Sequence, residues 1–215
     1  NCVINEATID FDLDGIATIQ WSGFGDKVID GGAANITPTI YEDIDDTSNF
    51  IRNRLTSLAI TNANSLSSGT HNITLTGGSM TISNNVTYLT PETLGVINRP
   101  LGNITGTRSV SGNLTCYLNS EAAGSADLFE DIIESNDGSA ADLVTNDFNL
   151  VLSIGGTTAP NVTITMATCH LEVPTMSFDD IVSTDVAFHA LPSKLDPSAA
   201  AEFEITSIVY KGIAG

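Results

Sequence analysis

Basic side chains are scarce in this 215-residue chain, which has 7 Lys and Arg residues against 26 Asp and Glu residues and a formal net charge of −19. Proteins that grip the phosphate backbone of nucleic acids carry a basic stripe or patch. The deficit therefore argues against a nucleic-acid-binding protein, although it is compatible with DNA that passes nearby without adhering. The acidic residues are scattered along the chain, and a highly soluble or salt-adapted surface has the same composition.

Cysteine and long apolar runs are also scarce. Cys2, Cys116 and Cys169 are an odd number of widely spaced cysteines without a C-x-x-C pair, so we expect free thiols and a reducing compartment. No apolar run approaches the roughly 20 residues of a membrane helix, and the first residues lack the pattern of a signal peptide. The chain begins without Met inside a segment of strand-like composition, which leads us to expect a further domain upstream.

Sequence motifs for catalysis, phosphate binding and metal binding are missing or incomplete. There is no G-x-S-x-G, no H-E-x-x-H and no phosphate-binding loop. Asp10, Asp12, Asp14 and Gly15 copy the start of a calcium loop, but Trp21 occupies the position of its closing Glu. We therefore expect no catalytic residue, no cofactor and no metal site.

Alternation of apolar and polar residues is the dominant pattern. In residues 7–22, apolar side chains alternate with Asp up to Gly15 and then resume, which predicts two strands joined by a turn. Gly77-Gly78 and Asn84-Asn85 predict two hairpin turns. The other segments of β-rich composition are 71–89, 147–154, 161–173 and 201–212. Residues 49–61 predict either a hairpin arm or a short helix, followed by a strand.

One segment has helical periodicity. In residues 126–135, Leu128 and Ile132 recur at the i, i+4 spacing, and Ser125 stands at the position of an N-cap. We therefore predict a mainly β fold, a β-sandwich or partial barrel with one flanking α-helix.

The strand predicted after residue 107 has two different faces. Its apolar side carries Val110, Gly112, Leu114, Cys116 and Leu118. Its other side, formed by every second residue, is neutral and rich in hydroxyl groups: Thr107, Ser109, Ser111, Asn113 and Thr115. Such a face suits a surface along which something slides, and an ordinary solvent-facing sheet has the same composition. Both interpretations stay open at this point.

Residues 24–48 form a long polar segment rich in Gly and acidic residues. Loops of this length usually have a function. Its acidic run is Glu42, Asp43, Asp45 and Asp46, and two cations follow it, Arg52 and Arg54.

Six N-x-T triplets begin at Asn35, Asn72, Asn85, Asn103, Asn113 and Asn161. They favour an alternative function, a secreted carbohydrate-binding or adhesive β-sandwich glycoprotein. However, Thr is common in strands for conformational reasons, which explains several of these triplets without any glycan.

The chain resembles the tail tube proteins of bacteriophages with long, non-contractile tails. The resemblance lies in ATIDFDLDGIATIQWSG (7–23), PETLGVINRPLGNITGTRSVSGNLTCYL (91–118) and ADLFEDIIES (126–135), and with the closing strands it covers most of the chain. It implies a β-sandwich with a flanking helix, whose inner strands join those of neighbouring subunits into a multi-subunit β-barrel. The resulting rings stack into a tube.

The resemblance also implies partners and roles. The expected protein is a non-enzymatic virion component assembled in the host cytoplasm. Its partners are copies of itself, other tail proteins and the tape measure protein, and double-stranded DNA passes through it without specific binding. Residues 1–215 then form one tube domain, in hexameric rings or, if the chain is the downstream part of a longer duplicated protein, in trimeric rings. The lumen-facing candidates are Asp10, Asp12, Asp14, Thr107, Ser109, Ser111, Asn113 and Thr115, and the inter-ring candidates are Glu42, Asp43, Asp45, Asp46, Arg52 and Arg54.

Overall fold

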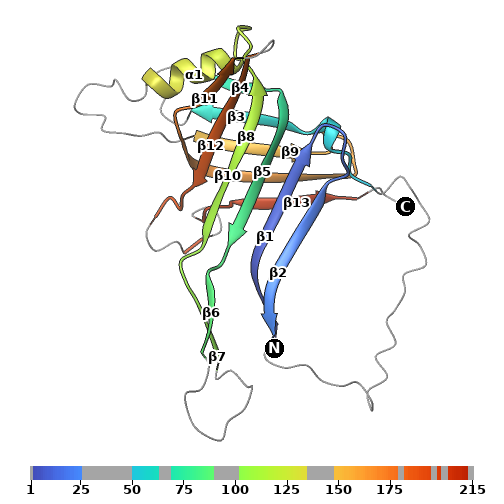
Figure 1. The fold of residues 1–215 in the computed structure, drawn as a ribbon, viewed down its shortest axis with the longest axis vertical. Coiled ribbons are helices and arrows are strands. Elements are labelled where there is room, and N and C mark those ends of the chain that lie inside the picture. The colour runs from blue at the N-terminus through green and yellow to red at the C-terminus, as the bar shows by residue number, and fades with distance from the viewer. Residues whose placement is uncertain are drawn as a thin grey trace, which may run out of the picture.

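The computed structural model describes residues 2–25, 50–62, 69–89, 102–134, 148–178, 182–194, 198–199 and 203–212 (Figure 1). The predicted loop at 24–48 lies outside the described residues beyond Gly25, together with its four acidic candidates. The predicted mainly β fold is confirmed, because strands dominate and one α-helix accompanies them.

Two layers of antiparallel strands pack face to face. The front layer contains, in spatial order, β2 (Thr18–Gly25), β1 (Cys2–Asp12), β5 (Leu75–Ser83), β8 (Ser109–Tyr117), β12 (Val182–Ala190) and β11 (Thr175–Phe178). The back layer contains β4 (Thr70–Ile73), β3 (Ser57–Asn62), β9 (Phe148–Ile154), β10 (Asn161–Leu171) and β13 (Ser207–Lys211). Figure 1 shows the front strands running steeply down the view while β3, β9, β10 and β13 cross behind them.

The two layers are one continuous sheet that folds over itself at β10. The first part of this strand pairs with β9 and β13. After an irregularity between Met166 and Cys169, its end pairs with β12. A bulge bends the strand that contains it, which lets one strand serve both layers.

Alternating side chains from both layers fill the core. The front layer contributes Ile9, Phe11, Met80, Val110, Leu114, Cys116, Val186 and Phe188. The back layer contributes Leu58, Ile60, Ile73, Phe148, Leu150, Leu152, Ile154, Ile164, Met166, Cys169 and Leu171. Burial of this much apolar surface is the main stabilising term of the sandwich. All three cysteines are free thiols, as predicted.

Helix α1 (Ser125–Glu134) closes one end of the sandwich, within one residue of its predicted bounds. Leu128 and Ile132 are buried, and the imidazole of His71 on β4 lies 2.7 Å from the carboxylate of Asp131. Ser125 is part of the helix and does not cap it, because its hydroxyl donates to the Tyr117 carbonyl and accepts from the Asn119 amide.

Both predicted hairpin turns are wrong. Gly77 and Gly78 lie inside β5, where a Cβ on Gly78 would meet the Asn113 carbonyl oxygen at 2.5 Å and the Phe11 ring at 2.7 Å. These glycines therefore permit close packing instead of a chain reversal. Asn85 has φ 48° and links β5 to β6 (Val86–Leu89). Because β6 pairs with β7 (Gly102–Thr105) while β5 pairs with β8, the link continues one long hairpin.

Residues 49–61 follow the second of the two predictions, a short helix and then a strand. A 3₁₀ helix, η3 (Asn53–Leu55), precedes β3. The turn predicted at Gly15 is confirmed, since β1 ends at Asp12 and β2 begins at Thr18. The Asp12 carboxylate accepts the amide of Gly15 at 2.8 Å, which gives this acid a structural role in the turn.

Candidate functional site: a polar sheet face between two open edges

The outer face of the front layer is a continuous polar surface. On β1 the odd residues from Ala7 to Phe11 point into the core, so the even residues point outward. The register then aligns polar residues in rows across the strands. One row joins Asp10 to Ser79 and Asn113, and the next joins Thr8 to Thr81 and Ser111.

The sequence-predicted candidates fall on this face in part. Asp10 and Asp12 of β1 share it with the β8 residues Ser109, Ser111, Asn113 and Thr115, and β5 lies between the two strands. Asp14 is exposed in the turn after β1, at one end of the face. Thr107 precedes β8 at the other end, where its carbonyl accepts the side-chain amide of Asn85 at 2.6 Å.

Hydrogen bonds between neighbouring strands order the polar side chains. The Ser79 hydroxyl donates to the Asn113 side-chain carbonyl at 2.8 Å, and the Thr115 hydroxyl donates to the Asp185 carboxylate at 2.7 Å. A face whose donors are already paired within the protein has fewer groups with which to hold a passing polymer.

The charge on this face is negative. Glu6, Asp10, Asp12 and Asp185 contribute carboxylates, and no Lys or Arg lies on the strands of the front layer within the described residues. His189 on β12 lies 3.2 Å from the Glu172 carboxylate and is exposed. The field above the face therefore repels a polyanion.

A buried thiol lies on the opposite side of the same sheet. Burial, with a smaller contribution from the Asp185 carboxylate, raises the pKa of Cys116 to about 11. The thiolate is the reactive form of cysteine, so this thiol is inert at neutral pH and acts as a small apolar core residue.

Several residues of the face escaped the sequence analysis, among them Ser79 and Thr81 of β5 and Asp185 and His189 of β12. The misplaced hairpin at Gly77-Gly78 obscured β5. No element was predicted for β12, although Val186, Phe188 and Ala190 alternate with polar or small residues and provide the signal for a half-buried strand.

The first edge of the front layer is β2. Within the described residues it pairs only with β1, so that part of the structure offers no strand partner for its other side. Thr18 and Gln20 pair with Asp10 and Thr8 and continue the polar face. Trp21 lies on the core side of the sheet but is 62% exposed, because the back layer does not cover this strand.

The second edge is β11, which pairs with β12. Thr175 is opposite Asp185 and Ser177 is opposite Ser183, so both extend the polar face. Met176 is opposite the buried Thr184 and points to the core side. Neither β2 nor β11 contains a charged residue, although the chain has a net charge of −19. Charge-free open edges are unusual on a soluble protein, which normally protects its edge strands.

Arg52 and Arg54 lie beside the β1–β2 turn. The amide of Asn53 donates to the Gly15 carbonyl at 3.1 Å, and Arg52 forms a bridge with Ile16. Both arginine side chains are exposed.

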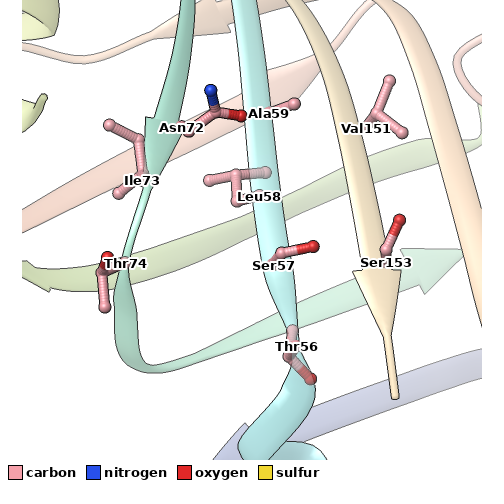
Figure 2. Close-up of a pocket in the computed structure, with 9 residues that line it drawn as sticks. All are labelled: Thr56, Ser57, Leu58, Ala59, Asn72, Ile73, Thr74, Val151 and Ser153. Carbon is pink, nitrogen blue, oxygen red and sulfur yellow. The ribbon is translucent and has the colours of Figure 1, made fainter. Parts of the chain in front are cut away.

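A shallow groove of about 250 Å³ lies on the outer face of the back layer, between β4, β3 and β9 (Figure 2). Figure 2 shows that its lining is made of small apolar and uncharged polar side chains: Thr56, Ser57, Leu58, Ala59, Asn72, Ile73, Thr74, Val151 and Ser153. This lining contains hydroxyl groups but no acid, base or thiol.

Among the described residues, no helix combines the length and the apolar character that a membrane crossing needs.

These features define a β-sandwich with a polar outer sheet face between two edge strands, β2 and β11. Such an arrangement is typical of a protein that assembles with copies of itself. The comparisons with known proteins agree. The family model of phage tail tube proteins matches residues 2–190. The chain is 34% identical over 206 residues to tail tube protein pb6 of Escherichia phage T5, a match that covers 91% of this chain and 42% of the relative.

The chain belongs to the phage tail tube protein family. The predicted family and location are confirmed. The comparisons give no support to the alternative of a carbohydrate-binding glycoprotein. The chain spans less than half the length of the relative that it matches.

Proposed function

We propose that this chain builds the wall of a ring-shaped tail tube, with the polar face of the front layer turned toward the channel. The observation that carries the proposal is the combination of a negative face and two open, charge-free edges at β2 and β11. Open edges present unpaired amide and carbonyl groups, and a neighbouring tube domain satisfies them.

Strand direction favours one way of closing the ring. From β2 through β1, β5, β8 and β12 to β11, each strand is antiparallel to the next. β2 and β11 therefore run in opposite directions. Rotation about a tube axis preserves strand direction, so β2 of one domain meets β11 of the next as an antiparallel pair.

The two edges also match in their faces. With Thr18 and Gln20 of β2 on the polar side, Thr175 of β11 continues the polar surface across the junction. On the other side, Trp21 meets Met176. Each subunit then covers the apolar surface that its neighbour leaves exposed.

The proposed lining lets DNA pass without adhering. Lys and Arg hold DNA by neutralising phosphates and releasing counterions, and the described front strands have none of these residues. Carboxylates repel the phosphates, while hydroxyl groups exchange hydrogen bonds with water. The lumen-facing residues in this proposal remain Asp10, Asp12, Asp14, Thr107, Ser109, Ser111, Asn113 and Thr115.

Subunit number and further partners are part of the proposal. The relative from phage T5 is more than twice as long as the matched region, since the match covers 42% of it. This supports rings of three longer subunits that each contain two tube domains, over rings of six short ones. The proposed role is structural and involves no catalysis. Its other partners are the tape measure protein and further tail proteins.

Labelling of assembled tubes tests the lumen assignment. We replace Ser111 by Cys in a Cys2→Ser background, and place the matched control, Asn72→Cys, on the outer face of β4. A small maleimide should reach both positions. A maleimide on a polymer too large for the channel should label the Asn72→Cys variant and leave the Ser111→Cys variant unmodified in tubes, but should label both in dissociated subunits. Equal labelling of both variants in intact tubes contradicts the assignment.

A further inference from the structure

Two histidines meet where the folded sheet passes from one layer to the other. His170 on β10 pairs directly with His189 on β12. The residues on either side of both histidines are buried in the core: Cys169, Leu171, Phe188 and Ala190. Because side chains alternate along a strand, both imidazoles point to the outer, polar face of the sheet.

The register brings the two imidazoles within reach of one another. Residues directly opposite each other in an antiparallel pair have Cβ atoms about 4.5–5.5 Å apart. At that separation, two side chains of the length of histidine can reach a common point above the sheet. His170 is half-buried and His189 is exposed. No sequence motif marks this pair, because the two residues are distant in sequence and meet only through strand pairing.

The carboxylate of Glu172 orients one of the two rings. The amide of Glu172 donates to the Ala187 carbonyl at 2.9 Å, and its carboxylate lies 3.2 Å from Nε2 of His189. An ionised carboxylate only accepts hydrogen bonds, so Nε2 carries the proton and Nδ1 of the neutral ring keeps its lone pair. Histidines that bind metals typically donate their other ring N–H to a carboxylate in this way.

We propose that His170 and His189 bind a divalent transition-metal ion such as Zn²⁺, with Nδ1 of His189 as one ligand and Glu172 as the residue that positions this ring. Imidazole nitrogen is a good ligand for Zn²⁺, Ni²⁺ and Cu²⁺, whereas Mg²⁺ and Ca²⁺ take oxygen ligands. The part of the chain that the structure describes contains no group of three ligand-type side chains around one point. The two imidazoles are therefore the protein ligands of the site, and water completes the coordination of the ion.

The charge of the polar face favours a cation at this position. Glu172 lies beside His189, and Asp185 lies on the same side of β12. The front strands carry no Lys or Arg among the described residues, so no basic side chain of these strands opposes a bound cation. A face of one charge sign raises the local concentration of ions of the opposite sign.

An ion held by both histidines links β10 to β12. The pairing of these two strands covers three residue pairs and joins the back layer to the front layer. A shared ion adds a connection at this short junction, and an ion that binds only the folded chain stabilises it. The site requires only the folded subunit, so it does not depend on closure of the proposed ring.

Calorimetric titration of dissociated subunits with Zn²⁺ tests the proposal. A Cys2→Ser background removes the exposed thiol, which is itself a zinc ligand. At neutral pH the subunit should bind one Zn²⁺, and either His170→Gln or His189→Gln should weaken binding by roughly tenfold or more. Glu172→Gln should weaken it by about tenfold. The matched control, Glu121→Gln, makes the same change at an exposed carboxylate in the turn before α1 and should leave binding unchanged.

Nitrogen-15 NMR of the histidine rings identifies the ligand atoms. The chain contains three histidines, and the third, His71, is buried beside Asp131. Zn²⁺ should shift the ring nitrogens of His170 and His189, including Nδ1 of His189, and leave those of His71 in place.

Four results would overturn the proposal. They are the absence of Zn²⁺ binding, binding that persists in both histidine variants, a shift confined to one of the two rings, and equal affinity for Mg²⁺, which would show that the carboxylates bind cations without the imidazoles. Failure of the protein to form rings would refute the proposed tube and leave this titration unaffected, since it uses dissociated subunits.

Discussion

Replacement of Trp21 by Ser should prevent ring assembly and leave the fold of the subunit intact. Trp21 is 62% exposed on β2, at the edge that we propose to pair with β11 of the next domain. A Trp side chain buries up to about 250 Å², so covering the exposed part removes roughly 150 Å² from water. At about 25 cal/mol per Å², this burial contributes up to about 4 kcal/mol per contact, or a factor of roughly 10²–10³ in the association constant.

The protein contains one Trp, so its fluorescence reports directly on this contact. Emission should shift to shorter wavelength when rings form, since the indole leaves water. Sedimentation velocity should show that the Trp21→Ser variant remains dissociated at concentrations at which the unmodified protein assembles. Val209→Ser, an exposed apolar position on β13, is the control and should assemble normally.

Two results would refute this reasoning. Assembly of the Trp21→Ser variant at unchanged concentration would show that β2 is not the ring contact. Ring formation without any change in Trp emission would show that the indole stays in water. Unfolding of the variant at a lower temperature than the parent would instead indicate that Trp21 supports the subunit itself, which its exposure argues against.

Three further predictions concern the subunit. Gly78→Ala should lower the free energy of unfolding by about 1–3 kcal/mol, measured by urea denaturation, because the added Cβ meets the Asn113 carbonyl at 2.5 Å; unchanged stability would show that the strand shifts freely. Arg108→Ala should lower it by about 1–3 kcal/mol, since the largely buried Glu204 carboxylate loses its ion pair, and Arg108→Lys should restore part of the loss. Burial raises the pKa of Cys116 from 9.0 to about 11. The free energy of unfolding should therefore fall as pH rises from about 9 to about 11, because only the unfolded chain releases this proton in that range. Cys116→Val should flatten that part of the pH profile, and an unchanged profile would contradict this account.

Local patterns in the sequence predicted the elements well where one physical cause dominated. The alternation around Asp10 and Ser111 predicted strands with one polar face, and the i, i+4 pair Leu128 and Ile132 predicted the helix, because each pattern reflects the direction in which side chains point. Both predicted hairpin turns failed, because Gly serves close packing as readily as it serves turns, and packing against Phe11 depends on residues distant in sequence.

Sequence patterns could not predict the order of the strands in the sheet, because that order also depends on residues distant in sequence. Asp10 and Asn113 lie on one face because β5 pairs with both of their strands, and register between such distant segments depends on the whole core. The edge strands could not be predicted either. The composition of β2 predicts a strand, but its position at the end of the layer depends on how all the other strands of the sheet pair.

The acidity of the chain and its capacity to assemble are compatible because the charge is distributed unevenly. A uniform charge of this size would oppose association through self-repulsion. The strands that we propose as contacts, β2 and β11, have no charged residue, whereas the face between the two edges carries Asp10, Asp12 and Asp185. With this separation, hydrogen bonds and apolar burial can hold the proposed subunit contacts together, while the carboxylates on the polar face repel a polyanion. In the tube that we propose, the wall remains repulsive to a polyanion after assembly, because Asp10, Asp12 and Asp185 lie outside the proposed contact strands.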